Sequence, residues 1–167
     1  MLSNHLPTDY QNFIALSRYA RWKEDEQRRE TWTETVSRYF DYLSGHLKKK
    51  HNYVLVDELR VELETAVLDQ HIMPSMRALM TAGPALERDN TAGYNCSYLP
   101  VDDPKAFDEA MYILLCGTGV GFSVERQYVL QLPEIPQSLD HVDTCIQVQD
   151  SKEGWARALR KLIGHLY

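Results

Sequence analysis

A cysteine and a run of glycines stand about twenty residues apart in the second half of this 167-residue chain. Cys96 lies within residues 94–98 (YNCSY), and glycine recurs through residues 117–123 (GTGVGFS). A thiol can supply electrons, and it forms a disulfide when it is oxidised. Backbone without side chains can approach a phosphate or a sugar closely. If the fold brings the two segments together, they can line one pocket.

The elements that must position these segments follow from the local pattern. Residues 94–101 read as a strand, with Pro100 tolerated only near its end. Asp102, Asp103 and Pro104 then open a helix that runs to about Cys116, and its apolar residues recur at helical spacing. The glycine-rich run reads as a second strand. Strand, helix and strand in this order predict a βαβ unit with two parallel, adjacent strands.

The chain before residue 93 reads as helical. Thr31 and Glu34 form a capping box ahead of an apolar stripe that ends in a basic run, residues 48–50. Further helices are expected over residues 56–70 and 75–81, and a last one begins after an N-cap at Ser151. The charged run 23–30 reads as the solvated face of a helix. The aromatic residues expected in the core are Trp22, Trp32, Tyr39 and Phe40.

Composition limits the classes of function. The net charge is −6 with no basic block, which argues against nucleic-acid binding. No apolar run is long enough for a membrane span, and the N-terminus is not a signal sequence, so a cytoplasmic protein is expected. The cysteines form neither a disulfide framework nor a CxxC zinc site, so they are expected to be reduced thiols, and no metal site is expected.

Each feature also has a plainer interpretation. A cysteine on a strand is often a small buried apolar residue, and this interpretation is kept for Cys116 and Cys145. A glycine-rich strand is often a packing site, and GxGxG alone is weak evidence for a phosphate cradle. Because Asn95 and Cys96 accompany this glycine-rich strand in the sequence, substrate contact is favoured over packing as the role of the glycines.

These segments resemble the catalytic subunit of ribonucleotide reductases, most closely the adenosylcobalamin-dependent (class II) type. Asn95-Cys96 is similar to the Asn-Cys or Ser-Cys pair of that family's first barrel strand, and a Gly-x-Gly-Val-Gly strand follows in both. Residues 73–79 (MPSMRAL) and 150–155 (DSKEGW) also resemble the family. The resemblance covers residues 13–167 and only the N-terminal portion of such an enzyme. It implies an α/β fold, in which an N-terminal helical region (1–92) precedes the first βαβ elements of a ten-stranded barrel (93–167), left incomplete here.

The resemblance also implies a chemistry. In the family a cysteine thiyl radical takes the 3′-hydrogen of the ribose, water leaves from C2′, and two cysteines reduce the sugar as they become a disulfide. Cys96 matches one member of that reducing pair. The radical cysteine and the second reducing cysteine belong to later parts of the family sequence. Substrate contacts carry over to Met73, Pro74, Ser75, Asn95, Cys96, Thr118, Gly119 and Val120, and Asp103 falls near the allosteric specificity site.

Two classes of function follow. The first is the N-terminal part of a ribonucleotide reductase, from a split enzyme or a truncated chain, which serves deoxyribonucleotide biosynthesis and DNA replication and is inactive in isolation. It needs the C-terminal remainder, adenosylcobalamin, a ribonucleotide substrate and an external thiol reductant such as thioredoxin. The second is a non-catalytic nucleotide-binding or regulatory module derived from the reductase. The residues leave open a diphosphate or a triphosphate substrate, and a different radical source.

Overall fold

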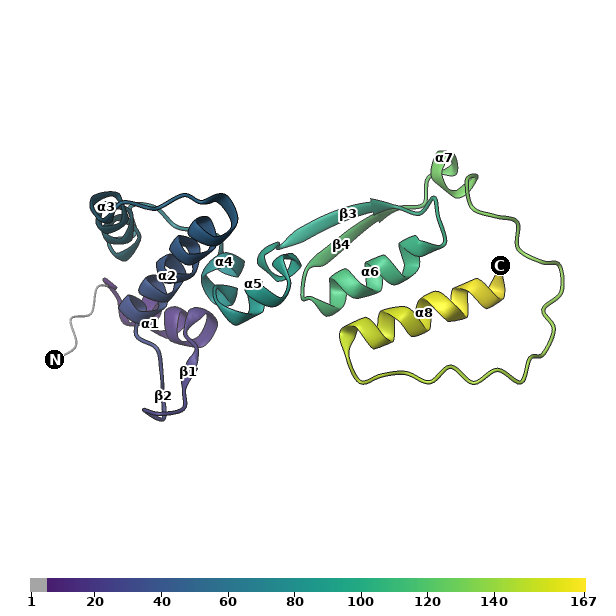
Figure 1. The fold of residues 1–167 in the computed structure, drawn as a ribbon, viewed down its shortest axis with the longest axis horizontal. Helices are drawn as coiled ribbons and strands as arrows, with labels where there is room; N and C mark the ends of the chain where they lie inside the picture. The colour runs from purple at the N-terminus through teal and green to yellow at the C-terminus, as the bar shows by residue number, and fades with distance from the viewer. Residues whose placement is uncertain (1–5) are drawn as a thin grey trace. The chain divides into compact units, whose positions relative to one another are not determined.

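The computed structural model describes residues 6–167. The chain folds into two compact units: unit 1 ends at Gly93, and unit 2 spans Tyr94–Tyr167 (Figure 1). None of the helices in the described part of the chain is long and apolar enough to cross a membrane.

Unit 1 is mainly helical. Its core is formed by Leu6 and by apolar side chains from η1, α2, α3 and α4, with Val36 and Leu79 fully buried. Trp32 also belongs to this core and donates from Nε1 to the carbonyl of Leu68 (3.2 Å). The elements are α1 (Asp9–Ile14), the π-helical turn η1 (Ala15–Tyr19), β1 (Trp22–Lys23), β2 (Arg28–Arg29), α2 (Trp32–His51), α3 (Asp57–Leu68), α4 (Met76–Thr81), α5 (Pro84–Arg88) and the 3₁₀ turn η2 (Asn90–Gly93).

Helix α2 begins as its sequence predicts. The Thr31 hydroxyl accepts from the Glu34 N–H (3.2 Å), and the Glu34 carboxylate accepts from the Thr31 N–H (2.7 Å). This capping box satisfies backbone donors that the first turn leaves without partners. At the other end, Asn52 adopts a left-handed conformation (φ 51°) and ends the helix.

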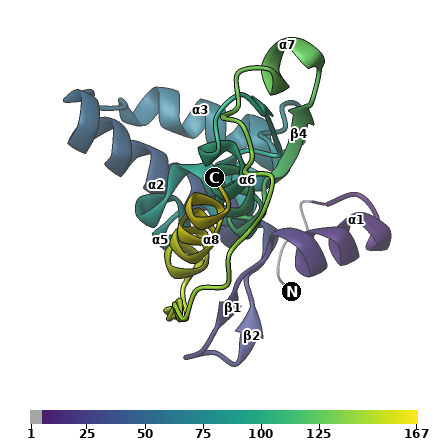
Figure 2. The same ribbon diagram turned by 90° about the vertical axis from the view of Figure 1, so that its right-hand side faces the viewer.

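The charged run 23–30 is not a helix face, and that prediction was wrong. β1 and β2 pair antiparallel, with Trp22 opposite Arg29 and Lys23 opposite Arg28, so the run forms a hairpin (Figure 2). Gln27 takes a positive φ (50°) in the turn. Trp22 is 49% exposed on this hairpin rather than in the core. Ion pairs join this hairpin to α2: Lys23 and Arg28 each pair with Glu34 at 2.7 Å.

The later helices of unit 1 start and stop within a few residues of expectation. Ser75 caps α4 by accepting from the Ala78 N–H (3.1 Å). Helix α4 ends at Thr81, as expected, and Gly83 and Pro84 then start α5, a helix that the sequence did not predict. Gly83 takes a positive φ (105°), and Pro84 occupies the first helical turn, where its missing N–H costs no hydrogen bond.

Unit 2 contains the predicted βαβ arrangement. β3 (Cys96–Pro100) and β4 (Gly119–Ser123) pair parallel, and α6 (Lys105–Leu115) connects them. Helix α6 lies along one face of this sheet, and α8 (Lys152–Leu166) packs beside α6 (Figure 1). Leu99, Val101 and Ala106 form the buried core between sheet and helix. Helix α6 begins at Lys105 with Pro104 as its N-cap, so Pro104 is not the first helical residue that the sequence predicts. The Asp103 carboxylate accepts from the Lys105 N–H (2.8 Å).

Helix α8 follows the short helix α7 (Arg126–Val129) and a long segment without regular structure, residues 133–149. Ser151 caps α8 by accepting from the Gly154 N–H (3.0 Å), as predicted. Gly154 is buried, and a Cβ at this position would overlap the backbone carbonyl of Gln149. The DSKEGW segment thus needs a glycine where the chain turns tightly into the helix. The reductase barrel expected from the resemblance amounts here to these two strands.

Candidate functional site

The thiol and the glycines meet directly on the sheet of unit 2. In the parallel register Cys96 lies opposite Gly119, and Tyr98 lies opposite Gly121. The Gly119 N–H donates to the carbonyl of Asn95 (2.9 Å), which fixes this register at its first residue. These four residues come from two distant parts of the sequence and form one short row on the sheet, called the glycine row below.

This row lies on the sheet face away from α6. Side chains alternate between the two faces of a strand, and Leu99 and Val120 pack in the core beneath α6. Cys96 and Gly119 lie on the opposite face and are both exposed. Cys96 is not in a disulfide. The unit thus presents a thiol beside backbone that carries no side chain.

Neither glycine of the row is required by the packing of unit 2. A Cβ built on Gly119 would lie 3.5 Å from the Asn95 carbonyl oxygen, and one on Gly121 would lie 3.6 Å from the Ser97 carbonyl oxygen. Both are ordinary van der Waals distances. Packing inside the unit therefore does not explain the glycines, whereas it does explain Gly154.

Thr118, beside the row, makes its contacts inside unit 2. Its side chain is almost completely buried, at 1% exposure, and its hydroxyl donates to the carbonyl of Tyr94 (2.9 Å). Gly117 precedes it with a positive φ (84°) at the end of α6. Thr118 thereby fixes the start of β4, while Val120 points into the core. Of the predicted contacts in this unit, Asn95, Cys96 and Gly119 are the exposed ones.

The remaining predicted site residues lie elsewhere. Met73, Pro74 and Ser75 belong to unit 1, where Met73 is 50% exposed and the Ser75 hydroxyl caps α4. Asp103 is exposed in unit 2 and accepts from the Lys105 N–H just before α6. Nothing in these contacts assigns a ligand to them, and their roles stay predictions.

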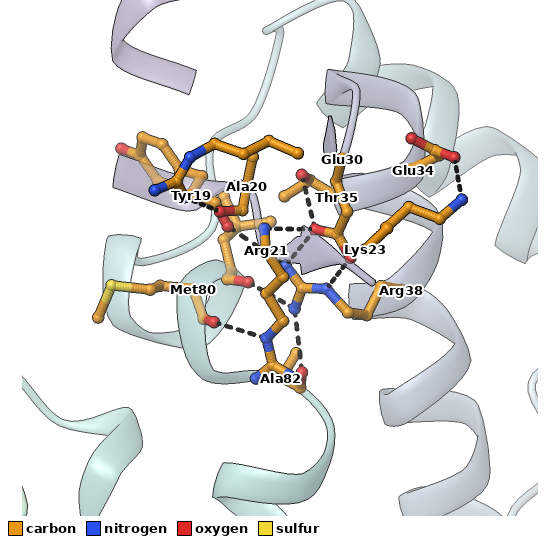
Figure 3. Close-up of polar contacts among 12 residues, drawn as sticks. Tyr19, Ala20, Arg21, Lys23, Glu30, Glu34, Thr35, Arg38, Met80 and Ala82 are labelled. Carbon is orange, nitrogen blue, oxygen red and sulfur yellow. Dashed lines mark hydrogen bonds and ion pairs between the residues drawn. The ribbon is translucent and has the colours of Figure 1, made fainter. Parts of the chain in front are cut away.

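The sequence reading missed a polar network in unit 1, centred on Arg38 (Figure 3). Its guanidinium forms an ion pair with Glu30 (Nε to Oε1 2.8 Å, Nη2 to Oε2 3.0 Å), and both side chains are largely buried. The same group donates to the carbonyls of Leu79 (3.0 Å) and Ala82 (2.9 Å), at the C-terminal end of α4. Arg21 donates to Met80 in the same turn (3.4 Å). The network joins α2, the hairpin and α4, the helix that follows the predicted contacts at Met73 to Ser75.

This network perturbs its ionisable groups. Burial alone would raise the pKa of Glu30, but hydrogen bonds from Arg38 and from the Arg21 N–H outweigh it and hold the pKa below its usual value. The pKa of Glu34 is also lowered, mainly by Arg28, against a smaller effect of burial. Burial, helped by Arg38, lowers the pKa of Arg21. These shifts indicate a structural ion network, since no exposed reactive group takes part.

The other two cysteines differ from Cys96. Cys145 is exposed in the irregular segment, and Cys116 ends α6, where it accepts a hydrogen bond from Lys152 (3.0 Å). Among the residues that the structure describes, no group of three or more His, Cys, Asp or Glu side chains could hold a metal ion.

Comparison with known proteins agrees with this arrangement. A family profile described as "Ribonucleotide reductase alpha domain" matches residues 3–83. The adenosylcobalamin-dependent ribonucleoside-triphosphate reductase of Lactobacillus gasseri is 27% identical over 149 residues, which cover 73% of this chain and 20% of that protein. The enzyme of the same name from Lactobacillus delbrueckii subsp. bulgaricus is 24% identical over 169 residues, covering 85% and 22%.

A solved structure gives the same answer for the fold. A B-12 dependent (class II) ribonucleotide reductase matches with a TM-score of 0.76 at 21% identity, over 93% of this chain and 29% of that one. The chain therefore spans only about a fifth of the length of the curated relatives. The resemblance found in the sequence is confirmed: the chain is similar to part of the adenosylcobalamin-dependent ribonucleotide reductases in sequence, and to a class II reductase in fold.

Proposed function

We propose that this chain is the N-terminal part of a ribonucleotide reductase and supplies one of the two thiols that reduce the ribose. The observation that carries the proposal is the register of β3 and β4, which sets the exposed thiol of Cys96 opposite Gly119. Cys96 would give up its hydrogen and form a disulfide with a second thiol as water leaves from C2′ of the substrate.

The glycine row would hold the nucleotide. Gly119 and Gly121 carry no side chain that would keep a phosphate or a sugar away from this face of the sheet, although the unit itself has room for a Cβ at both positions. Asn95, next to the thiol, is exposed and can contribute polar contacts. Met73, Pro74 and Ser75 are further proposed substrate contacts, and Asp103 is the proposed allosteric contact. Thr118 and Val120 are proposed to contribute through backbone atoms, since their side chains point into unit 2.

The radical thiol and the second reducing thiol would come from the C-terminal remainder of the reductase. Cys116 and Cys145 do not match the family positions of those thiols, and Cys116 is hydrogen-bonded to Lys152. Adenosylcobalamin would be the radical source of the completed enzyme, as the resemblance implies. The oxidised pair would be reset by an external dithiol such as thioredoxin.

Complementation tests this proposal. The 167-residue chain alone should make no deoxynucleotide with adenosylcobalamin, a ribonucleoside triphosphate and a dithiol. Addition of the separately produced C-terminal polypeptide should restore turnover, because the reaction needs reacting atoms within about 3–3.5 Å of each other. Turnover by the chain alone would refute the incomplete-enzyme proposal.

The Cys96→Ser variant tests the thiol itself. In the complemented enzyme it should lower deoxynucleotide formation by at least about 10³-fold while nucleotide affinity changes only a few fold, since serine fills similar space but cannot form a disulfide. Cys145→Ser, at another exposed thiol of unit 2, is the matched control and should retain activity. Normal turnover by Cys96→Ser would remove Cys96 from the mechanism.

The alternative is a nucleotide-binding or regulatory module without catalysis. It predicts that the chain binds ribonucleotides alone and that the C-terminal polypeptide adds no turnover. An exposed thiol in register with the glycine row favours the first function, because a module that only binds has no use for it.

A further inference from the structure

A thiol and an amine of unit 2 lie in contact outside the proposed nucleotide site. Nζ of Lys152 is 3.0 Å from Sγ of Cys116, and the same Nζ lies 5.1 Å from the centre of the Tyr112 ring. Cys116 and Tyr112 are at the C-terminal end of α6, and Lys152 is the first residue of α8. Cys116 and Lys152 are both partly exposed, so small reagents can reach them.

Two features hold this pair in place. The ring of Tyr112 attracts the ammonium, which favours the rotamer that points toward Cys116. The backbone around Lys152 is fixed by the Ser151 cap and by Gly154, which fits only without a Cβ against Gln149. A lysine side chain loses conformational entropy when it is ordered. The contacts of Lys152 already order it in the fold, so bond formation costs less of this entropy. The sulfur and the nitrogen are therefore already within reach of a bond.

We propose that Cys116 and Lys152 form an oxidative modification site, at which peroxide closes a covalent sulfur–nitrogen bond between α6 and α8. In the first step, Sγ attacks hydrogen peroxide: an S–O bond forms, the O–O bond breaks and water leaves, giving a sulfenic acid. In the second step, Nζ, after losing a proton to solvent, attacks Sγ: the S–N bond forms, the S–O bond breaks and a second water leaves. Sulfur is oxidised, peroxide is reduced, and the protein loses two hydrogen atoms in total.

The bond has a structural consequence that the free pair lacks. It closes the segment 117–151, which contains β4, α7 and the irregular residues 133–149, into a covalent ring. Such a link limits the unfolded chain more than the folded one, so it should stabilise unit 2. A dithiol reverses it by reducing sulfur and releasing the amine.

Mass spectrometry of the intact 167-residue chain tests the site. After stoichiometric hydrogen peroxide we expect a loss of about 2 Da, a peptide pair joined through Cys116 and Lys152, and return to the starting mass with dithiothreitol. Lys152→Arg keeps the positive charge and should instead gain about 16 Da or more at Cys116, with no joined peptides. The variant Cys96→Ser/Cys145→Ser should behave like the parent, which excludes a disulfide as the source of the mass loss.

Several results would overturn the proposal. These are a gain of about 16 Da on the parent without joined peptides, the same loss of about 2 Da in Cys116→Ser, or the same loss in Lys152→Arg. Far-ultraviolet circular dichroism of each variant checks that unit 2 is folded before oxidation. The proposed function does not enter this test, because the readout is the mass of the isolated chain and involves no turnover.

Discussion

Each unit contains a carboxylate paired with an arginine, but the two pairs differ in how completely they are enclosed. In unit 1 the side chains of Glu30 and Arg38 are 10% and 16% exposed, and the arginine also donates to three backbone carbonyls. In unit 2 Asp108 is 7% exposed but Arg160 is 52% exposed, and Oδ1 of the aspartate has no hydrogen-bond partner among the described residues. The first pair is enclosed inside unit 1, whereas the second lies at the surface of unit 2, with its arginine half exposed.

The burial of apolar side chains also differs between the two units. The core of unit 1 gathers around Val36, Leu79 and Val67, which are almost fully buried. In unit 2 the largest exposures include those of Tyr98 and Phe122 on the two strands, at 62% and 64%. Unit 1 also exposes apolar side chains, such as Tyr10 and Val54 at 72% and 64%, but it has the larger buried core, whereas the exposed apolar side chains of unit 2 include residues of both strands of its sheet.

The largest effect should come from breaking the enclosed pair. Glu30→Gln leaves the buried charge of Arg38 without an opposite charge, and the free energy of unfolding of unit 1 should fall by about 3–5 kcal/mol. Trp32 is buried in the core of unit 1, so its fluorescence in urea, measured in a Trp22→Phe/Trp155→Phe background, reports this unit alone. A change below about 1 kcal/mol would mean that the network does not join the helices of unit 1.

A backbone clash should give the next largest effect, this time in unit 2. Gly154→Ala places a Cβ against the carbonyl of Gln149, and the free energy of unfolding of unit 2 should fall by about 1–3 kcal/mol. Gly164→Ala is the matched control on the same helix: no atom lies within 4 Å of its Cβ, and it should gain about 0.5–1 kcal/mol. Urea titration followed by Trp155, as the only tryptophan, measures both. Equal effects of the two alanines would contradict the tight entry into α8.

The surface pair should matter less than the enclosed one. Arg160→Met removes the partner of Asp108, but water can reach the site of a side chain that is half exposed, so the cost should be about 1 kcal/mol. The same Trp155 titration applies. If Arg160→Met costs unit 2 as much as Glu30→Gln costs unit 1, the contrast between the pairs fails.

The dependence of stability on pH gives a further test of the ion pairs in unit 1. Arginine partners hold the pKa values of Glu30 and Glu34 below those of the unfolded chain, near about 4.3. The unfolded state therefore binds protons first, so this contribution is fully present above that value and is lost as the pH falls through the lower folded values. The Trp32 signal should show no change from pH 7 to about 5.5 and then a steep loss of stability below about pH 4. The loss should be smaller in Glu30→Gln.

Local signals in the sequence predicted much of this structure. Capping at Thr31 and Ser151 and the parallel pairing of the βαβ unit need only neighbouring residues or a short crossover, and all three are confirmed. The exposed thiol beside the glycines followed from the same local pattern. The functional roles of these residues remain predictions, because the contacts inside the chain do not reveal a ligand.

Contacts between residues far apart in the sequence explain most of the features that the sequence did not predict. Residues 23–30 were read as a helix face because their charges are dense, yet Glu30 is buried by Arg38 and the carbonyls at the end of α4, which lie much further along the chain. Helix α5 was missed because Gly83 and Pro84 carry signals both for stopping one helix and for starting another. No local pattern pointed to Lys152 as the partner of Cys116.

The irregular segment between α7 and α8 gives unit 2 a property of practical use. Its residues 137–145 are exposed and take part in no helix or strand, so a protease should cut there first. The cut would separate α8 from the rest of the unit covalently, but α8 would still pack against α6. The two products should therefore elute together and part only in denaturant, which makes this segment a natural place to insert a reporter or to move the chain ends.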